Sequence, residues 1–182
     1  MAGPPGSGKS ALAGPLARAL GCALLAVDPI EAALWRAGIA RDQPTGLAAY
    51  IVAEALAREQ LHLGNDVIVD AVNDATAARQ QWRSLAAQCA SPLVFVVVSC
   101  SDERVHRQRF ESRRRDIEGF PESAWEAVVE RQAGFVGWSD EGVHIDSLRP
   151  LKEEIRTVLD HIERSRRASQ ALASMEAEAA RH

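Results

Sequence analysis

Cysteine, lysine and long apolar runs are scarce in this 182-residue chain, and each shortage argues against a class of protein. Its three cysteines, Cys22, Cys89 and Cys100, are widely spaced and form no C-x-x-C pair. That pattern argues against a zinc site and is typical of reduced thiols in the cytosol. The apolar runs, such as Leu93 to Val98, are all much shorter than the roughly 20 residues that cross a bilayer. We therefore expect a cytoplasmic protein without a membrane anchor.

Basic charge is not in excess either. The formal net charge is -4 at pH 7, which argues against a general attraction to nucleic acid or to an anionic membrane. Hydrophobic residues make up 47% and charged residues 25%, the composition of an ordinary globular domain. The five histidines show no catalytic spacing, and we expect the four tryptophans in the core or in a pocket wall. Lys9 and Lys152 are the only two lysines, so the setting of Lys9 is informative.

Lys9 lies in a glycine-rich segment near the start of the chain. Residues 3–10 read Gly-Pro-Pro-Gly-Ser-Gly-Lys-Ser, the G-x-x-x-x-G-K-S pattern of a phosphate-binding loop. Glycines let the backbone curl so that its N–H groups point at a phosphate, and the next helix adds the positive end of its dipole. A Gly/Pro-rich surface turn is the alternative, which four fixed positions disfavour. The pattern predicts a nucleotide site made of Gly3, Pro4, Pro5, Gly6, Ser7, Gly8, Lys9, Ser10 and Ala11.

A phosphate loop of this kind follows a strand and opens a helix. The Ala- and Leu-rich residues 11–20, ended by Gly21, predict the helix. Only Met1 and Ala2 precede Gly3, and two residues are too few for a strand of about five. We therefore expect the strand upstream of Met1, and tighter ATP binding by a version extended upstream than by the chain as given.

Apolar runs alternate with helical patterns along the rest of the chain. This alternation predicts an α/β fold, with a parallel sheet covered by helices on both faces. Strands are predicted at 22–27, 67–69, 93–98 and 143–145, and helices from 28 and at 47–63, 74–90, 101–115, 122–135 and 151–162. We expect one domain over residues 1–162, with a lid at about 101–137, and a polar tail at 163–182 that is helical or disordered.

Ligands of such sheets bind at the carboxyl ends of the strands, and two aspartates are predicted there. Asp70 ends Val-Ile-Val-Asp and would lie near Ser10, where it could hold Mg²⁺; as an alternative, it caps the next helix. Asp28 follows the first predicted strand and could accept a proton from a substrate hydroxyl. Asp28 and Glu31 also form a capping-box pattern, which explains the pair equally well.

Six arginines crowd residues 104–115, and Arg109 and Arg113 share a helix face. Arginine binds phosphate oxygens in a fork, and a break at 116–121 would let the segment hinge as a lid. A solvated helix face that pairs with Glu111 and Glu118 is the alternative. We expect phosphate contact for one or two of the arginines and solvent for the others.

The chain resembles the P-loop small-molecule and nucleotide kinases in four segments. They are the phosphate loop, Val-Asp-Pro-Ile-Glu at 27–31, Val-Ile-Val-Asp-Ala-Val-Asn at 67–73, and the arginine-rich segment. Within this group of kinases the chain is most similar to the kinases labelled AAA-family ATPases, akin to polynucleotide kinase, chloramphenicol phosphotransferase and zeta toxins. The resemblance implies a three-layer P-loop NTPase fold with a five-stranded parallel sheet, whose loop strand is largely missing here. It also implies ATP and Mg²⁺ as cofactors, held in part by Ser10 and Asp70, and it matches Asn73 to a position after the third strand. It implies catalytic roles for Lys9, Asp28, Arg109 and Arg113.

The activity expected from the resemblance is transfer of the terminal phosphoryl group of ATP to a hydroxyl of a small molecule. Residues 41–50 are expected to shape the acceptor pocket, but no motif there names the acceptor. Two other functions stay open: a nucleotide-binding regulatory ATPase that acts as a switch, and a kinase of nucleic-acid 5'-hydroxyls. The acidic net charge disfavours the second of these.

Overall fold

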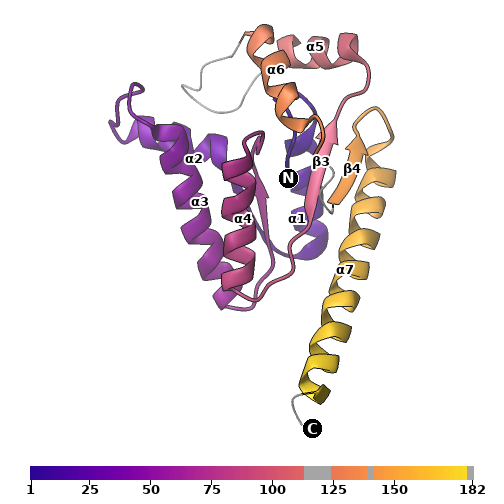
Figure 1. The fold of residues 1–182 in the computed structure, drawn as a ribbon. Coiled ribbons are helices and arrows are strands. Elements are labelled where there is room, and N and C mark those ends of the chain that lie inside the picture. Colours follow the sequence, from indigo (N-terminus) through magenta and orange to yellow (C-terminus); the bar gives the residue numbers. More distant parts are fainter. Residues whose placement is uncertain (113–123, 139–141, 180–182) are drawn as a thin grey trace.

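Strands and helices alternate along the chain, as the sequence predicts (Figure 1). The computed structural model describes residues 1–112, 124–138 and 142–179. The elements, in chain order, are α1 (Lys9–Leu20), β1 (Ala23–Ala26), α2 (Val27–Arg36), α3 (Thr45–His62), β2 (Val67–Asp70), α4 (Thr76–Gln88), β3 (Phe95–Ser99), α5 (Glu103–Ser112), α6 (Trp125–Gln132), a 3-10 turn (Ala133–Phe135), β4 (Gly142–Asp146) and α7 (Leu151–Ala179).

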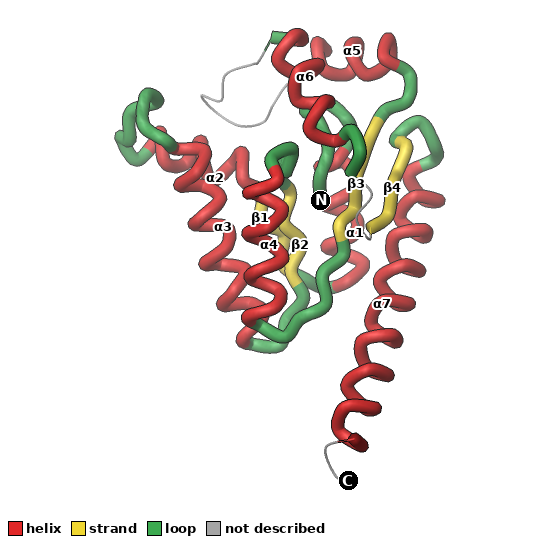
Figure 2. Tube along the Cα trace, in the orientation of Figure 1, coloured by secondary structure: helices red, strands yellow, loops and turns green. Residues whose placement is uncertain are grey.

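The strands form two parallel pairs. β1 pairs with β2, with Ala26 opposite Asp70, and β3 pairs with β4. The first residues of the chain lie between the two pairs, because Ala2 forms a parallel bridge with Val97 of β3 (Figure 2). The order across the sheet is therefore β1, β2, residues 1–3, β3 and β4. The expected parallel sheet is confirmed, and the first residues of the chain lie at its centre.

Helices cover both faces of the sheet. Alternate residues of β3 point to opposite faces, so Phe95 and Val97 pack in one buried cluster and Val96 and Val98 in another. The first cluster lies under α3 and α4, where an alanine stripe in α3 lets that helix approach closely. The second lies under α1 and α7. The core is thus divided by the sheet, as expected for a three-layer α/β domain.

The capping box predicted at Asp28 is wrong. α2 begins at Val27, directly after β1, and its N-cap residue is Ala26, which makes no side-chain cap hydrogen bond. Asp28 therefore lies inside the first turn of the helix, where a carboxylate is favoured by the helix dipole. Glu31 instead accepts a hydrogen bond from Thr45 Oγ1 at 2.8 Å. β1 pairs with β2 up to Ala26, which lies opposite Asp70, and α2 begins at the next residue. The local sequence could not predict this start, because the pairing joins segments far apart in the chain.

The last helix is longer than the predicted 151–162. α7 continues through residue 179, so the part of the predicted tail that the structure describes, residues 163–179, is helical. Val158 belongs to the second cluster, and Ile155, Leu159 and Ile162 pack against it. Among the described residues, no helix combines the length and apolar character needed to cross a membrane.

Candidate nucleotide-binding site

Residues 3–10 form a tight loop between the centre of the sheet and the start of α1. Gly3, Gly6 and Gly8 have φ values of 141°, 80° and 100°, a region that side chains rarely adopt. A Cβ on Gly3 would lie 2.1 Å from the carbonyl oxygen of Val98, so this glycine is also required by close approach to β3. Because α1 begins at Lys9, the loop wraps around the positive end of a 12-residue helix. This geometry is suited to binding an anion.

The side chains of the loop turn toward the loop itself. Lys9 is buried, and its Nζ donates a hydrogen bond to the carbonyl oxygen of Pro4 at 3.1 Å. Ser7 is fully buried, and within the described part of the chain its Oγ has no hydrogen-bond partner. An ammonium group over the loop and a buried hydroxyl without a partner are both suited to phosphate oxygens, which accept such hydrogen bonds.

Ser10 and Asp70 meet at the edge of the loop. Ser10 Oγ donates a hydrogen bond to Asp70 Oδ2 at 2.6 Å, and Asp70 is only 7% exposed. The other carboxylate oxygen, Oδ1, is buried and has no hydrogen-bond partner among the residues that the structure describes. A hydroxyl beside a carboxylate with an unused oxygen fits Mg²⁺, which usually takes one or two protein oxygens, waters and substrate phosphates. The described residues contain no cluster of three or more histidine, cysteine or acidic side chains that could hold a metal ion.

Asp28 lies at the neighbouring strand end, close to Tyr50 of α3. Burial raises the pKa of Tyr50 to about 12, and the negative charges of Asp74 and Asp28 add to this shift. The hydroxyl of Tyr50 accepts a hydrogen bond from the main-chain N–H of Asn73 at 3.2 Å. The charges of Asp28, just after β1, and of Asp74, in the segment after β2, therefore both act on the phenol of Tyr50.

Arg109 of α5 reaches toward the loop from the lid side. Its Nη1 donates hydrogen bonds to Ser147 Oγ at 2.9 Å and to the Ser147 carbonyl oxygen at 3.3 Å. Ser147 lies against the loop, because a Cβ on Gly8 would be 3.1 Å from the Ser147 Cβ. Arg107 instead pairs with Glu111 at 2.7 Å on an exposed face, as expected for the solvated arginines. Arg113, the second predicted lid arginine, lies outside the described residues.

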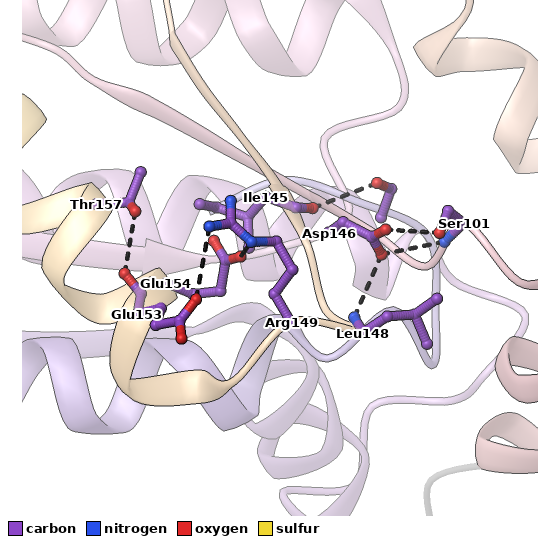
Figure 3. A network of polar contacts seen from close by, with 9 residues as sticks. Ser101, Ile145, Asp146, Leu148, Arg149, Glu153, Glu154 and Thr157 are labelled. Carbon is purple, nitrogen blue, oxygen red and sulfur yellow. Dashed lines mark hydrogen bonds and ion pairs between the residues drawn. The ribbon is translucent and has the colours of Figure 1, made fainter.

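The segment that holds Ser147 is fixed by a polar network (Figure 3). Asp146 accepts hydrogen bonds from Ser101 Oγ at 2.5 Å and from the main-chain N–H groups of Ser101 and Leu148, each at 3.2 Å. The Ser101 hydroxyl is the largest cause that holds the pKa of Asp146 below its usual value. At the start of α7, Arg149 pairs with the buried Glu154 at 3.3 Å. The loop that meets Gly8 and Arg109 is thus well anchored.

Comparison with known proteins agrees with this geometry. A family model described as AAA domain matches residues 1–135. The chain belongs to the AAA domain family. No curated protein matches it. This AAA domain has the P-loop NTPase fold, which many solved structures share.

Three solved structures illustrate the likeness. Kti12 from Chaetomium thermophilum, in complex with ADP-AlF3, has a TM-score of 0.68 at 20% identity over 90% of this chain and 96% of its own. A gluconokinase from Sinorhizobium meliloti 1021 has a TM-score of 0.66 at 21% identity over 96% and 94%. The APS kinase CysC from Mycobacterium tuberculosis, in complex with AMPPNP and APS, has a TM-score of 0.63 at 18% identity over 89% and 94%. At these identities the likeness is one of fold.

Asn73 is a residue of this AAA domain that its local sequence did not indicate. It is 2% exposed and has a φ of 58°, in the left-handed region. Its Nδ2 donates a hydrogen bond to the carbonyl oxygen of Met1 at 2.8 Å, and its Oδ1 accepts one from Trp82 Nε1 at 2.8 Å. Asn73 therefore joins the first residues of the chain to α4, beside the site. Only the family resemblance had selected this position, because nothing local distinguishes a buried asparagine from a turn residue.

His106 was missed altogether. It lies in α5, is 1% exposed, and its Nε2 is 2.8 Å from the carbonyl oxygen of Pro5 in the phosphate loop. Phe110, one turn later, packs on Gly6, where a Cβ would lie 3.0 Å from the Phe110 Cβ. α5 therefore rests on the loop through one face and presents Arg109 from another. The spacing of four between His106 and Phe110 was the available signal, since both residues lie on one helix face.

Proposed function

We propose that this AAA domain is an ATP- and Mg²⁺-dependent phosphotransferase that moves the terminal phosphoryl group of ATP to a hydroxyl of a small molecule. The contact between Ser10 and Asp70 is the main support, because it joins the phosphate loop to a carboxylate with an unused buried oxygen. If Asp70 had only a structural role, leaving its buried Oδ1 without a hydrogen bond from the described residues would cost about 1–3 kcal/mol with no gain in return. The family match and the kinase folds add support.

The residues of the site have separate tasks in this proposal. The main-chain N–H groups of the loop and the Lys9 ammonium bind the phosphates, and Ser10 and Asp70 hold the metal ion. When bound, Mg²⁺ neutralises charge on the β- and γ-phosphates. Arg109 releases its hydrogen bonds to Ser147 and donates to phosphate oxygens instead, which stabilises the charge that develops in the transition state. Positioning and charge stabilisation supply most of the catalysis of such transfers.

Asp28 orients the acceptor hydroxyl and accepts its proton. The carboxylate lies at the same edge of the sheet as Asp70, two residues beyond the end of β1. The corner between α2 and α3, which the acceptor would contact, is held by a short chain of hydrogen bonds. Trp35 Nε1 donates to Thr45 Oγ1 at 2.9 Å, and Thr45 donates in turn to Glu31. A rigid corner of this kind is suited to selecting a small acceptor by shape.

Nucleotide binding is tested by calorimetric titration with ATP and Mg²⁺. We expect Lys9→Ala to weaken ATP binding at least about tenfold, because the cation over the loop is lost. Lys152→Ala is a matched control, since Lys152 is the only other lysine and is exposed in α7. Equal ATP affinity of the two variants would contradict the proposed site.

Transfer is tested by ATP consumption against a panel of sugars, nucleosides and aminoglycosides. Asp28→Asn should keep ATP binding and lose transfer by about a hundredfold or more, as expected for a general base. Asp160→Asn, an exposed aspartate of α7, is the control. If Asp28→Asn keeps both binding and hydrolysis and no acceptor raises ATP consumption, the protein acts as a nucleotide switch rather than as a kinase.

A further inference from the structure

One side of α3 exposes large apolar side chains to solvent. The residues of this helix that lie fully buried in the first cluster are small, namely Ala49, Ala53 and Ala57. On the outward side, Leu47 is 61% exposed and Ile51 is 56% exposed. A surface helix normally has the reverse pattern, with its large apolar side chains toward the core. The outward side of α3 therefore has the composition of a covered surface.

The outward apolar side chains form one continuous surface, which we call the α3 stripe. It contains every exposed residue of the helix from position 47 to position 56: Leu47, Ile51, Val52, Ala55 and Leu56. Their spacings of one, three and four residues place them on one side of the helix. Figure 1 shows α3 at the opposite side of the molecule from α7, so the stripe is accessible to another molecule.

The stripe has nearly the same sequence in both directions. Residues 47–56 read Leu-Ala-Ala-Tyr-Ile-Val-Ala-Glu-Ala-Leu. About the midpoint of this segment, the mirrored pairs on the stripe and its border are Leu47 with Leu56, Ala48 with Ala55, and Ile51 with Val52. A two-fold axis at the midpoint would set two copies of α3 antiparallel, with each of these side chains opposite one of its own kind. An interface with two-fold symmetry requires such a self-complementary surface.

The two mirrored alanines allow the helices to approach closely. Ala48 and Ala55 are seven residues apart, or two turns, and lie between the larger side chains of the stripe. Small residues at a contact bring two helix axes toward the short end of the usual range of about 8–10 Å. The larger side chains on either side of the alanines could then pack against the other copy.

The ends of the stripe are electrostatically complementary in this arrangement. Glu59 is exposed one turn after Ala55, and Pro44 lies equally far from the midpoint in the other direction. Pro44 is the N-cap residue of α3, whose first turn contains no acidic residue and, in the part of the chain that the structure describes, no side-chain cap. The Glu59 carboxylate of one copy would therefore lie at the start of α3 in the other, where negative charge is favoured.

The exposed area is sufficient for a dimer. Ile39 is 41% exposed and Leu63 is 73% exposed, and they lie before and after α3, so the two-fold axis would bring them toward each other. If a fully exposed leucine presents roughly 180 Å², the stripes and these side chains of two copies would bury on the order of 1,000 Å² of apolar surface, which is what a specific interface needs. A contiguous apolar surface of this extent is uncommon on a monomer.

We propose that two copies of this chain associate through the α3 stripe, antiparallel about a two-fold axis between Ile51 and Val52. A partner of different sequence would have to supply a matching apolar surface, whereas the mirrored sequence of α3 supplies it from the same chain. The inference concerns association and does not depend on the phosphotransfer proposed above.

Sedimentation of the full chain without nucleotide tests the association. We expect a dimer with a Kd on the order of 10 µM or tighter. Ile51→Glu should raise this Kd at least about a hundredfold, because it brings two carboxylates together at the axis. Met175→Glu is the matched control and should leave the Kd unchanged, since Met175 is 68% exposed in α7 and lies outside the stripe.

Cysteine cross-linking tests the register without relying on a charged variant. Val52→Cys should form a disulfide between copies under mild oxidation, because the residue lies beside the axis. Leu47→Cys should not link to itself, since its counterpart in the other copy lies about 14 Å farther along the helix. A mixture of the Leu47→Cys and Leu56→Cys proteins should link. The unmodified chain, with its three free cysteines, gives the background.

Three results would overturn the proposal. A chain that stays monomeric up to about 200 µM would leave the stripe to a partner of different sequence. A dimer that Ile51→Glu does not weaken would place the interface elsewhere, and self-linking of Leu47→Cys would exclude the antiparallel register. None of these results bears on ATP binding, so failure of this proposal and failure of the proposed function are distinguishable.

Discussion

Replacement of Asn73 by alanine should be among the most destabilising single changes that keep the phosphate loop intact. The side chain makes two buried hydrogen bonds, to the Met1 carbonyl oxygen and from Trp82 Nε1. It also belongs to a residue in the left-handed region, with a φ of 58°. Asn73→Ala removes both bonds and leaves a residue that tolerates this conformation less well than asparagine.

The size of the effect follows from these contacts. Each buried group left without its partner costs about 1–3 kcal/mol, and there are two of them. The left-handed conformation adds about 1 kcal/mol for alanine. Allowing for partial relaxation, we expect Asn73→Ala to lower the free energy of unfolding by about 4 kcal/mol. That is a large part of the roughly 5–15 kcal/mol that stabilises an ordinary domain.

Urea unfolding followed by tryptophan fluorescence measures this loss, since Trp82 is buried beside Asn73. Asn73→Gly separates the two causes, because glycine tolerates the left-handed region and should be less destabilising than alanine by about 1 kcal/mol. Asn65→Ala is the control: its Nδ2 donates to Gln60 Oε1 at 3.2 Å on the surface, and its loss should cost under about 0.5 kcal/mol. If Asn73→Ala costs no more than Asn65→Ala, the bridging role of Asn73 is refuted.

Three shorter predictions concern the loop, the chain start and the metal. Gly3→Ala should destabilise the protein by at least about 3 kcal/mol more than Gly21→Ala in urea unfolding, because both have positive φ but only Gly3 would meet a carbonyl oxygen at 2.1 Å. Similar losses would contradict the close approach to β3. The pKa of the Met1 amino group is lowered from 8.0 to about 6, so between these values the unfolded chain binds a proton that the folded chain does not. The free energy of unfolding should therefore rise by about 2 kcal/mol from pH 6 to pH 8 when Met1 is retained, and an equal rise after amino-terminal acetylation would refute the assignment. Asp70→Asn should abolish the gain in ATP affinity that Mg²⁺ provides, about tenfold, and leave binding in EDTA unchanged; calorimetry that shows an undiminished Mg²⁺ effect would exclude Asp70 as a ligand.

The loop and the strand ends were predictable because their signals are local. The phosphate loop depends on residue types at fixed spacing, and its glycines have the positive φ values that the motif requires. The meeting of Ser10 and Asp70 followed from one topological rule, that parallel strands end at the same edge of the sheet.

The failures have a different origin. The capping box at Asp28 was wrong because pairing of β1 with β2 sets where the helix begins, and that pairing joins residues more than forty positions apart. His106 was missed because its partner, the Pro5 carbonyl oxygen, is 101 residues away in sequence. Neither contact can be recognised from the residues that are next to it in sequence.

The sequence by itself determined the phosphate loop and the alternation of strands and helices, since these depend on spacing and on short-range periodicity. The tertiary structure alone decided which polar atoms lack partners, where Arg109 and His106 rest, and how Asn73 joins Met1 to Trp82. It also revealed a mostly apolar cavity bounded in part by residues of β2 and β3. Such facts depend on which distant segments pack together, and packing is a property of the whole chain.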